Sequence, residues 1–239
     1  VTFVVTPVVA AVSVARGWVA PPNERSVHTV PIPHAGGLAM LIGLVVALGV
    51  AAMTDSFREV FTDSREPIGV LVAAIVVYAT GFLDDSRDLP PPAKVTGIVI
   101  AALVLVWFGA TMFYFRVPFL DVFLLSGDWQ PVITVLWLLG MTQAINLIDG
   151  LDGLAAGIVA IAAAAFFLYA FRLGDLELLS RPNLGPLLAV VTAGVAVGFL
   201  PFNFNPARIF MGDGGAFLLG LLLAVSTSMV GGRADPGTQ

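Results

Sequence analysis

Residues 67–94 read PIGVLVAAIVVYATGFLDDSRDLPPPAK, and this stretch decides what kind of fold the chain adopts. Seventeen mostly apolar residues run directly into the adjacent acids Asp84 and Asp85, and a proline run then leads to Lys94. An apolar helix that ends on two carboxylates places them at a membrane surface. Because neighbouring carboxylates repel each other, we expect a cation beside them, and the candidates are a metal ion, Lys94 and Arg87. The simpler alternative is a solvated loop that only ends a transmembrane helix.

The composition indicates an integral membrane protein. Hydrophobic residues make up 58% of the chain and charged residues 11%, and the mean hydropathy is +0.97. Soluble domains carry about a quarter charged residues. The net charge of −5 argues against a nucleic-acid partner, which needs a basic face. The absence of cysteine excludes disulfides and thiolate metal sites.

Eight apolar stretches approach the length of about 20 residues that a helix needs to cross a membrane. No alternating pattern typical of a β-barrel occurs, so we expect an all-α polytopic bundle of about eight transmembrane helices. The stretches are residues 1–15, 37–53, 67–83, 95–115, 131–148, 153–171, 184–202 and 214–230.

Counting spans divides the polar links between two faces of the membrane. Links 16–36, 84–94, 149–152 and 203–213 fall on one face, and links 54–66, 116–130 and 172–183 fall on the other. The first face collects the patterned acids and amides, so we predict the functional site there. The charges of the second face, Glu66 among them, form no pattern that indicates chemistry. Basic residues divide almost evenly, so the positive-inside rule gives no orientation.

Residues 143–153 read QAINLIDGLDG and form a second polar motif. Asn146, Asp149 and Asp152 recur every three residues, which on a helix spreads them over about a third of the circumference. Gly150 and Gly153 allow close backbone approach to a ligand or break the helix. The alternative is that these acids are helix caps.

Residues 201–216 read PFNFNPARIFMGDGGA, just before an apolar stretch. Asp213 is therefore predicted at a helix N-terminus, as a cap or as a metal ligand beside a bound phosphate. Arg208 is a candidate phosphate clamp. The alternative is an ordinary turn at Asn205-Pro206. His28 and His34, in the proline-rich link 16–36, indicate little by themselves.

Four motifs together resemble the polyprenyl-phosphate N-acetylhexosamine-1-phosphate transferase family. They are ERSVHTVPIPHAGGLA, GFLDDSRDLPPPAK, NLIDGLDGLA and FNFNPARIFMGD, in the family's order and spacing, and the likeness extends over essentially all 239 residues. The resemblance implies transfer of a sugar-1-phosphate from a UDP-sugar to a polyprenyl phosphate, with release of UMP. It also implies that the patterned face is cytoplasmic and that the membrane is the plasma membrane.

The resemblance implies a role for each candidate residue. Oxygen ligands suit Mg²⁺, or Mn²⁺, rather than zinc. By resemblance, Asp213 is the metal ligand, Asp84 and Asp85 orient or deprotonate the lipid phosphate, and Lys94 holds the diphosphate. Asn146, Asp149, Asp152, Asn203 and Arg208 are the expected substrate-binding residues. Expected partners are the UDP-sugar, the polyprenyl phosphate and the membrane, with a homodimer also possible.

The chain departs from the family pattern at several positions. Members commonly carry Arg, Gln, Asn and Ser where this chain has His34, Ile98, Gln143 and Ala216. The family also has a histidine-rich cytoplasmic motif near its C-terminus. We therefore expect residues 1–239 to form one transferase domain that lacks the family's C-terminal helices and histidine-rich loop, and to show little or no transfer alone.

The favoured reaction uses UDP-GlcNAc as the donor and undecaprenyl or decaprenyl phosphate as the acceptor. The forms LPPPAK and PARIFMGD favour this branch over phospho-MurNAc-pentapeptide transfer, which is the alternative. A rival of another class is an ion-coupled transporter, but that function needs acids near the centres of spans. A third interpretation is an inactive fragment or scaffold.

Overall fold

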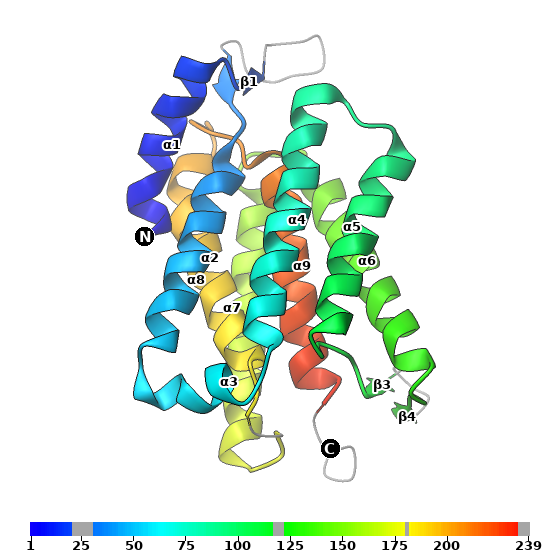
Figure 1. The fold of residues 1–239 in the computed structure, drawn as a ribbon. Coiled ribbons are helices and arrows are strands. Elements are labelled where there is room, and N and C mark those ends of the chain that lie inside the picture. Colours follow the sequence, from blue (N-terminus) through cyan, green and yellow to red (C-terminus); the bar gives the residue numbers. More distant parts are fainter. Residues whose placement is uncertain (21–30, 117–121, 180–181, 234–239) are drawn as a thin grey trace.

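The computed structural model describes residues 1–20, 31–116, 122–179 and 182–233. Within these ranges the chain is almost entirely helical, and the long helices pack side by side in one bundle (Figure 1). Each apolar stretch of the sequence holds one of them. The long helices are α1 (Thr2–Arg16), α2 (Gly36–Ala52), α4 (Glu66–Arg87), α5 (Pro91–Trp107), α6 (Trp129–Ile148), α7 (Leu154–Asp175), α8 (Gly185–Asn203) and α9 (Gly212–Gly231).

The all-α polytopic fold is confirmed, and the described helices differ in how well they suit a membrane crossing. Five of them, α4, α6, α7, α8 and α9, are both long and apolar enough to cross. Helix α2 qualifies only together with the short segment that follows it, from which it is bent by 96°. Helices α1 and α5 are apolar but have only 15 and 17 residues. By this strict criterion five or six of the described helices are long and apolar enough to be spans, against the eight predicted.

The links between the helices carry short elements. Strand β1 (Val19–Ala20) pairs antiparallel with β2 (Ile32–Pro33), β3 (Tyr114–Arg116) pairs with β4 (Val122–Leu124), and η1 (Asp55–Phe57) leads into α3 (Arg58–Thr62). The predicted span 95–115 ends early, because α5 stops at Trp107 and Gly109, with a φ of +93°, turns the chain toward β3.

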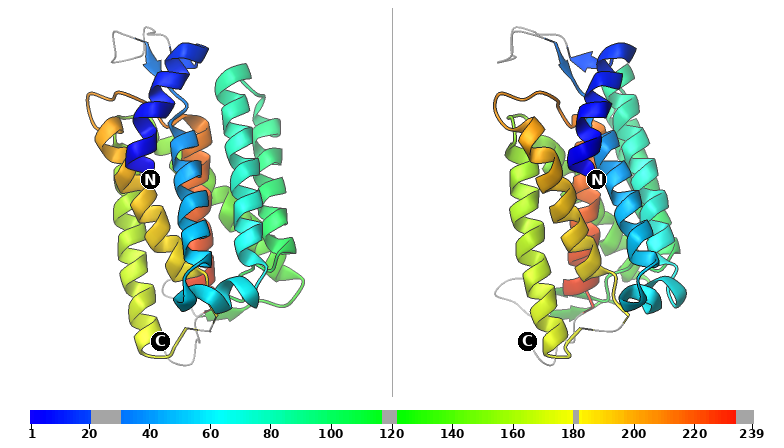
Figure 2. Two further views of the ribbon diagram at one scale, coloured as in Figure 1. Left: turned by 60° about the vertical axis from the view of Figure 1, so that its left-hand side comes forward. Right: turned by 90° about the vertical axis from the view of Figure 1, so that its left-hand side faces the viewer.

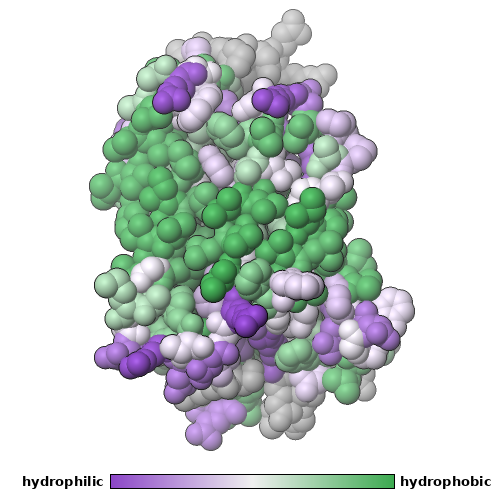
Figure 3. All heavy atoms as spheres, in the orientation of Figure 1, coloured by the Kyte–Doolittle hydropathy of each residue, from purple (hydrophilic) through white to green (hydrophobic). Residues whose placement is uncertain are grey.

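The two ends of the bundle are distinct. The α4–α5 turn, β1 and the start of α9 lie at one end, which we call the site end, and α3, β3 and β4 lie at the opposite end (Figure 1). A band of hydrophobic side chains crosses the middle of the surface, whereas hydrophilic ones gather toward both ends (Figure 3). This distribution is the one expected of a bundle that spans a membrane.

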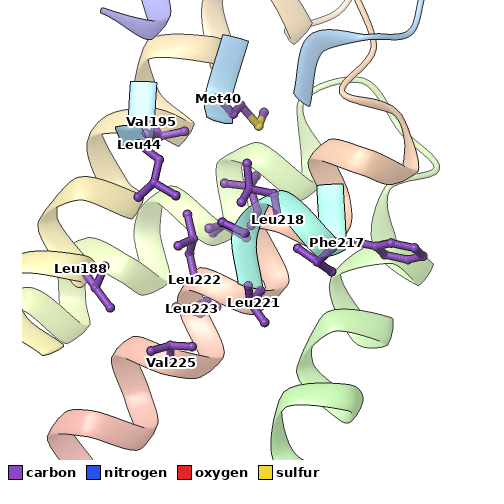
Figure 4. Close-up of a cluster of buried hydrophobic side chains, with 14 of the residues drawn as sticks. Met40, Leu44, Leu188, Val195, Phe217, Leu218, Leu221, Leu222, Leu223 and Val225 are labelled. Atoms are coloured by element: carbon purple, nitrogen blue, oxygen red, sulfur yellow. The ribbon is translucent and has the colours of Figure 1, made fainter. Parts of the chain in front are cut away.

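Helix α9 is the centre of the bundle. In its most apolar window 89% of the residues are buried, compared with 22–44% in the other four long spans. Two further views show α9 enclosed by its neighbours (Figure 2). Leu222 of α9 lies on the side of Leu44 of α2 and Leu188 of α8 in the buried cluster, whereas Phe217 and Leu221 point to another side of the helix (Figure 4). A helix that is apolar on all sides suits this interior position.

Glycines bring α2 and α4 unusually close to the first turn of α9. A Cβ atom at Gly37 of α2 would lie 2.4 Å from the backbone nitrogen of Gly215, and one at Gly81 of α4 would lie 2.3 Å from that of Gly214. Side chains at these positions would force the helices apart. Small residues are the usual means by which membrane helices approach so closely.

We expect Gly37→Ala to destabilise the bundle by about 1–3 kcal/mol, because the added methyl group meets backbone that cannot move aside. Gly49→Ala is the matched control on the same helix, since a Cβ atom there has nothing within 4 Å. Thermal unfolding in detergent measures both variants. Equal melting temperatures for the two would show that the α2–α9 approach is looser than described here.

Candidate active site

The link before α2 and the link before α9 are joined through their backbones. The N–H of Phe210 donates to the carbonyl of Pro33 at 2.8 Å, and the N–H groups of Gly36 and Gly37 donate to the carbonyls of Phe210 and Met211 at 3.0 and 2.9 Å. Two of the four links predicted to share a face therefore lie in contact. The residues Glu24, Arg25 and His28 of the first link lie outside the described residues.

Lys94 is the cation beside the paired acids in this structure. Helix α5 begins at Pro91, so Lys94 lies in its first turn rather than in the link. Its Nζ atom lies 2.5 Å from Oδ2 of Asp84 and 3.9 Å from Oδ2 of Asp213. Asp84 also accepts the N–H of Leu89 at 2.8 Å, which holds the α4–α5 turn closed. One lysine thus bridges the acids at the ends of α4 and α9.

Asp85 binds the N-terminus of α9. Its carboxylate accepts the N–H of Asp213 at 3.0 Å and the N–H of Gly214 at 3.5 Å. An anion at this position satisfies amides that have no partner within the helix and favours the positive end of the helix dipole. Nδ1 of His34 lies 4.0 Å from Oδ2 of the same carboxylate. Asp85 therefore fixes the position of Asp213, although α4 and α9 are far apart in the sequence.

Asp152 and Asn203 connect the α6–α7 and α8–α9 links. Asp152 accepts the side-chain amide of Asn205 at 3.1 Å and the N–H of Ala207 at 3.0 Å. Asn203 is buried; it accepts the N–H of Gly153 at 3.2 Å and donates to the carbonyl of Ile209 at 3.1 Å. Both ends of the Asn203 amide are thus bound to backbone. In this structure the residue positions the two links, while its role toward a substrate stays a prediction.

The structure places Asp149 and Asp152 in the predicted link 149–152 and not on one helix with Asn146. Helix α6 ends at Ile148, Asp149 is its C-cap with a ψ of 48°, and the chain turns to α7 through Gly153, whose φ is +74°. Only Asn146, in the last turn of α6, is helical. Gly150 and Gly153 lie in this break between the helices, which is one of the two roles predicted for them.

Asp149 has a perturbed acidity. Burial raises the pKa of Asp149 to about 7, and the negative charge of Asp85 acts in the same direction. The effect of Asp85 indicates that the α6–α7 link belongs to the same polar site. A raised carboxyl pKa is typical of functional groups. Arg208 lies on the same α8–α9 link as Asn205, with its side chain exposed.

The acids fit a divalent cation only in part. Among the described residues, no three His, Asp or Glu side chains are placed to hold a metal ion together. Magnesium, however, is usually bound by one or two carboxylates together with substrate phosphates. Asp213, whose side chain is 31% exposed, can supply such a carboxylate at the site end.

Several residues of the site were missed by the sequence analysis. Tyr78 packs against Gly214, and Gly81 and Gly37 allow the close helix approaches described above. The pairs Gly36-Gly37 and Gly214-Gly215 were a usable signal, because doubled glycines at the starts of two apolar helices favour close packing. The capping of α9 by Asp85 had no local signal.

These features define a multi-pass helical membrane protein whose acidic side chains converge, around one lysine, at one end of the bundle. Residues 67–231 match glycosyl transferase family 4. The chain belongs to this family.

The chain is similar to named members of the family. It is 36% identical over 239 residues to the decaprenyl-phosphate N-acetylglucosaminephosphotransferase of Mycobacterium tuberculosis, covering 97% of this chain. It is 37% identical over 223 residues, 93% of this chain, to a probable undecaprenyl-phosphate N-acetylglucosaminyl 1-phosphate transferase of Bacillus subtilis. Identity to the phospho-N-acetylmuramoyl-pentapeptide-transferase of B. subtilis is 34% over 205 residues, 79% of this chain. The chain spans 58% of the length of each of these three relatives.

We expect Asn203→Ala to destabilise the fold by about 1–3 kcal/mol, because it leaves the amide of Gly153 and the carbonyl of Ile209 without their partner. Asn205→Ala, which removes one exposed hydrogen bond to Asp152, is the control and should change stability little. Melting temperatures compare the two. If Asn205→Ala lowered the melting temperature as much as Asn203→Ala, Asn203 would not be the main connection between the two links.

Proposed function

We propose that the protein transfers N-acetylglucosamine-1-phosphate from UDP-GlcNAc to a polyprenyl phosphate, undecaprenyl or decaprenyl, and releases UMP. This is a first membrane step in building a cell-envelope glycopolymer. The proposal places the site end at the cytoplasmic face of the plasma membrane. The observation that carries it is Lys94, whose ammonium group lies between carboxylates from two helices at the end of a membrane-spanning bundle.

The location of the site at the end of the bundle fits one lipid substrate and one water-soluble substrate. A polyprenyl phosphate keeps its chain in the bilayer and its phosphate at the surface, whereas UDP-GlcNAc is water-soluble. Asp84 and Asp85 lie in the last turn of α4, and Asp213 lies in the first turn of α9. The acids are thus at span ends, where both phosphates can reach them, and not at the centres of spans as an ion-coupled transporter would need.

In the proposed reaction, an oxygen of the lipid phosphate attacks the phosphorus that carries the sugar. The bond from that phosphorus to the UMP oxygen breaks, and UMP leaves with the electron pair. Asp84 and Asp85 orient the lipid phosphate and take up its proton, and Lys94 moves from its acid partners to the diphosphate. Asn146, Asp149, Asp152, Asn203 and Arg208 form or position the donor pocket. Phosphoryl transfer of this kind depends mainly on positioning and charge neutralisation.

Asp213 is the proposed ligand for Mg²⁺, with Mn²⁺ as a substitute. The ion would supply charge neutralisation for the two phosphates when bound. Asp213 suits this role because its carboxylate is partly exposed beside Lys94, and its backbone is fixed by Asp85.

The comparisons favour GlcNAc as the sugar. Likeness to the two N-acetylglucosamine phosphotransferases extends over 93–97% of the chain, and likeness to the pentapeptide transferase extends over 79%. Phospho-MurNAc-pentapeptide transfer is therefore the second candidate.

UMP release by the purified full-length protein, with polyprenyl phosphate and Mg²⁺, tests the reaction and the donor together. We expect release with UDP-GlcNAc and little with UDP-MurNAc-pentapeptide. Asp213→Asn should abolish release at ordinary Mg²⁺ concentrations, because a neutral amide is a poor ligand for a hard cation. Preference for UDP-MurNAc-pentapeptide would show that the protein is a phospho-MurNAc-pentapeptide transferase. Near-normal release by Asp213→Asn would show that Asp213 is not the Mg²⁺ ligand.

Asp84→Asn and Asp85→Asn should each lower the turnover rate by about 10²–10⁴-fold while UDP-GlcNAc still binds, since both act on the acceptor phosphate. Asp85→Asn should also reduce the melting temperature, because it weakens the cap of α9 by about 1 kcal/mol. Steady-state kinetics and equilibrium binding of the donor separate these effects. If both variants kept the wild-type turnover rate and were only less stable, Asp84 and Asp85 would have a structural role at the end of α4 and no catalytic function.

A further inference from the structure

Arg233 is the centre of a cluster at the opposite end of the bundle from the acids. It lies two residues after the end of α9, and its Nη1 atom lies 2.6 Å from Oε1 of Glu66, the first residue of α4. The side chains of Arg233 and Glu66 are only 8% and 11% exposed. A buried ion pair is strongly disrupted when one partner is removed, because the other charge is left uncompensated.

The guanidinium of Arg233 makes further contacts with the chain that follows α5. It donates from Nε to the carbonyl of Thr111 at 3.1 Å and from Nη2 to the carbonyl of Gly109. It also lies over the ring of Phe113, 5.1 Å from the ring centre. One side chain therefore joins the end of α9, the start of α4 and the loop after α5. Lysine, with a point charge, cannot reproduce this set of contacts.

Helices α4 and α9 run in opposite directions and are connected at both ends. At the site end, Asp85 of α4 accepts the amides of Asp213 and Gly214. At the opposite end, Glu66 of α4 binds Arg233. Between the two connections lie the 20 residues of α9, about 30 Å of helix. These two contacts, one at each end of the helix pair, limit how far α9 can slide along α4.

We propose that the Glu66–Arg233 pair is a positioning device for the active site, setting the register of α4 against α9 and hence of Asp84 and Asp85 against Asp213. Neither residue touches the acids. The kinetic part of this inference rests on the proposed transfer reaction; the structural part does not. The cap at the site end consists of one bond of 3.0 Å to Asp213 and a longer one of 3.5 Å to Gly214, so a small shift of α9 along α4 would break the longer bond first.

The test measures hydrogen–deuterium exchange of the full-length protein in lipid nanodiscs without substrates. In Arg233→Gln and in Glu66→Gln, we expect peptides that contain Asp213 and Gly214 to exchange about tenfold faster than in the wild type, because the slipped helix loses its cap. In the same variants kcat for UMP release should fall by about tenfold to a hundredfold with little change in KM for UDP-GlcNAc, as small misplacements of reacting groups cause. If Arg233→Gln does not fold, Arg233→Lys should show the same faster exchange and the same lower kcat, each to a smaller extent.

Asn183→Ala is the matched control at the same end. Asn183 donates to the carbonyl of Met229 in α9 and accepts the N–H of Gly185, so it holds the last turns of α9 to α8 and not to α4. It should leave exchange at Asp213 and Gly214 unchanged. Faster exchange confined to the loop 109–114 in the Arg233 variants, with wild-type exchange at the start of α9, would overturn the inference. Because exchange is measured without substrates, its result stands even if no transfer is detected.

Discussion

The carboxylate of Asp85 that accepts the first amides of α9 is the interaction on which the rest of the site depends. A helix buried on all sides has its first N–H groups away from water, and they need a partner. Asp85 supplies it from α4, and the glycines at 37 and 81 let α2 and α4 come near enough to surround that terminus. The same contact sets Asp213 beside Lys94 and Asp84, so the packing of the bundle and the electrostatics of the site have one origin.

Charge balance at the site end follows from this arrangement. Three aspartates from α4 and α9 are brought together, and burying their charges unpaired would be costly. Lys94 neutralises part of that charge from the first turn of α5. In the α6–α7 link, burial and the negative charge of Asp85 raise the pKa of Asp149 to about 7.

Much of the fold was predictable because apolar runs of membrane length have one stable solution in lipid, the helix. The placement of Asp213 in the first turn of α9 followed from the glycines before an apolar run, and Lys94, now found beside Asp84, was one of three candidate cations. The start of α5 was missed because Pro91 and Pro92 were taken as part of the link, although proline suits the first turn of a helix. The contacts Asp85–Asp213 and Glu66–Arg233 join residues more than 100 positions apart. Such tertiary pairs leave no local pattern in a single sequence.

The shortness of α5 has a consequence for the surrounding lipid. Its 17 residues measure about 26 Å, whereas the hydrocarbon core of a bilayer is about 30 Å thick. If α5 crosses the membrane with its neighbours, tilting cannot relieve this mismatch, and thinning of the adjacent bilayer or snorkelling of flanking residues would have to accommodate it. Local thinning would bring the headgroup layer closer to the first turn of α5, where Lys94 lies. Lipid phosphate groups would then lie closer to the depth of the acidic site.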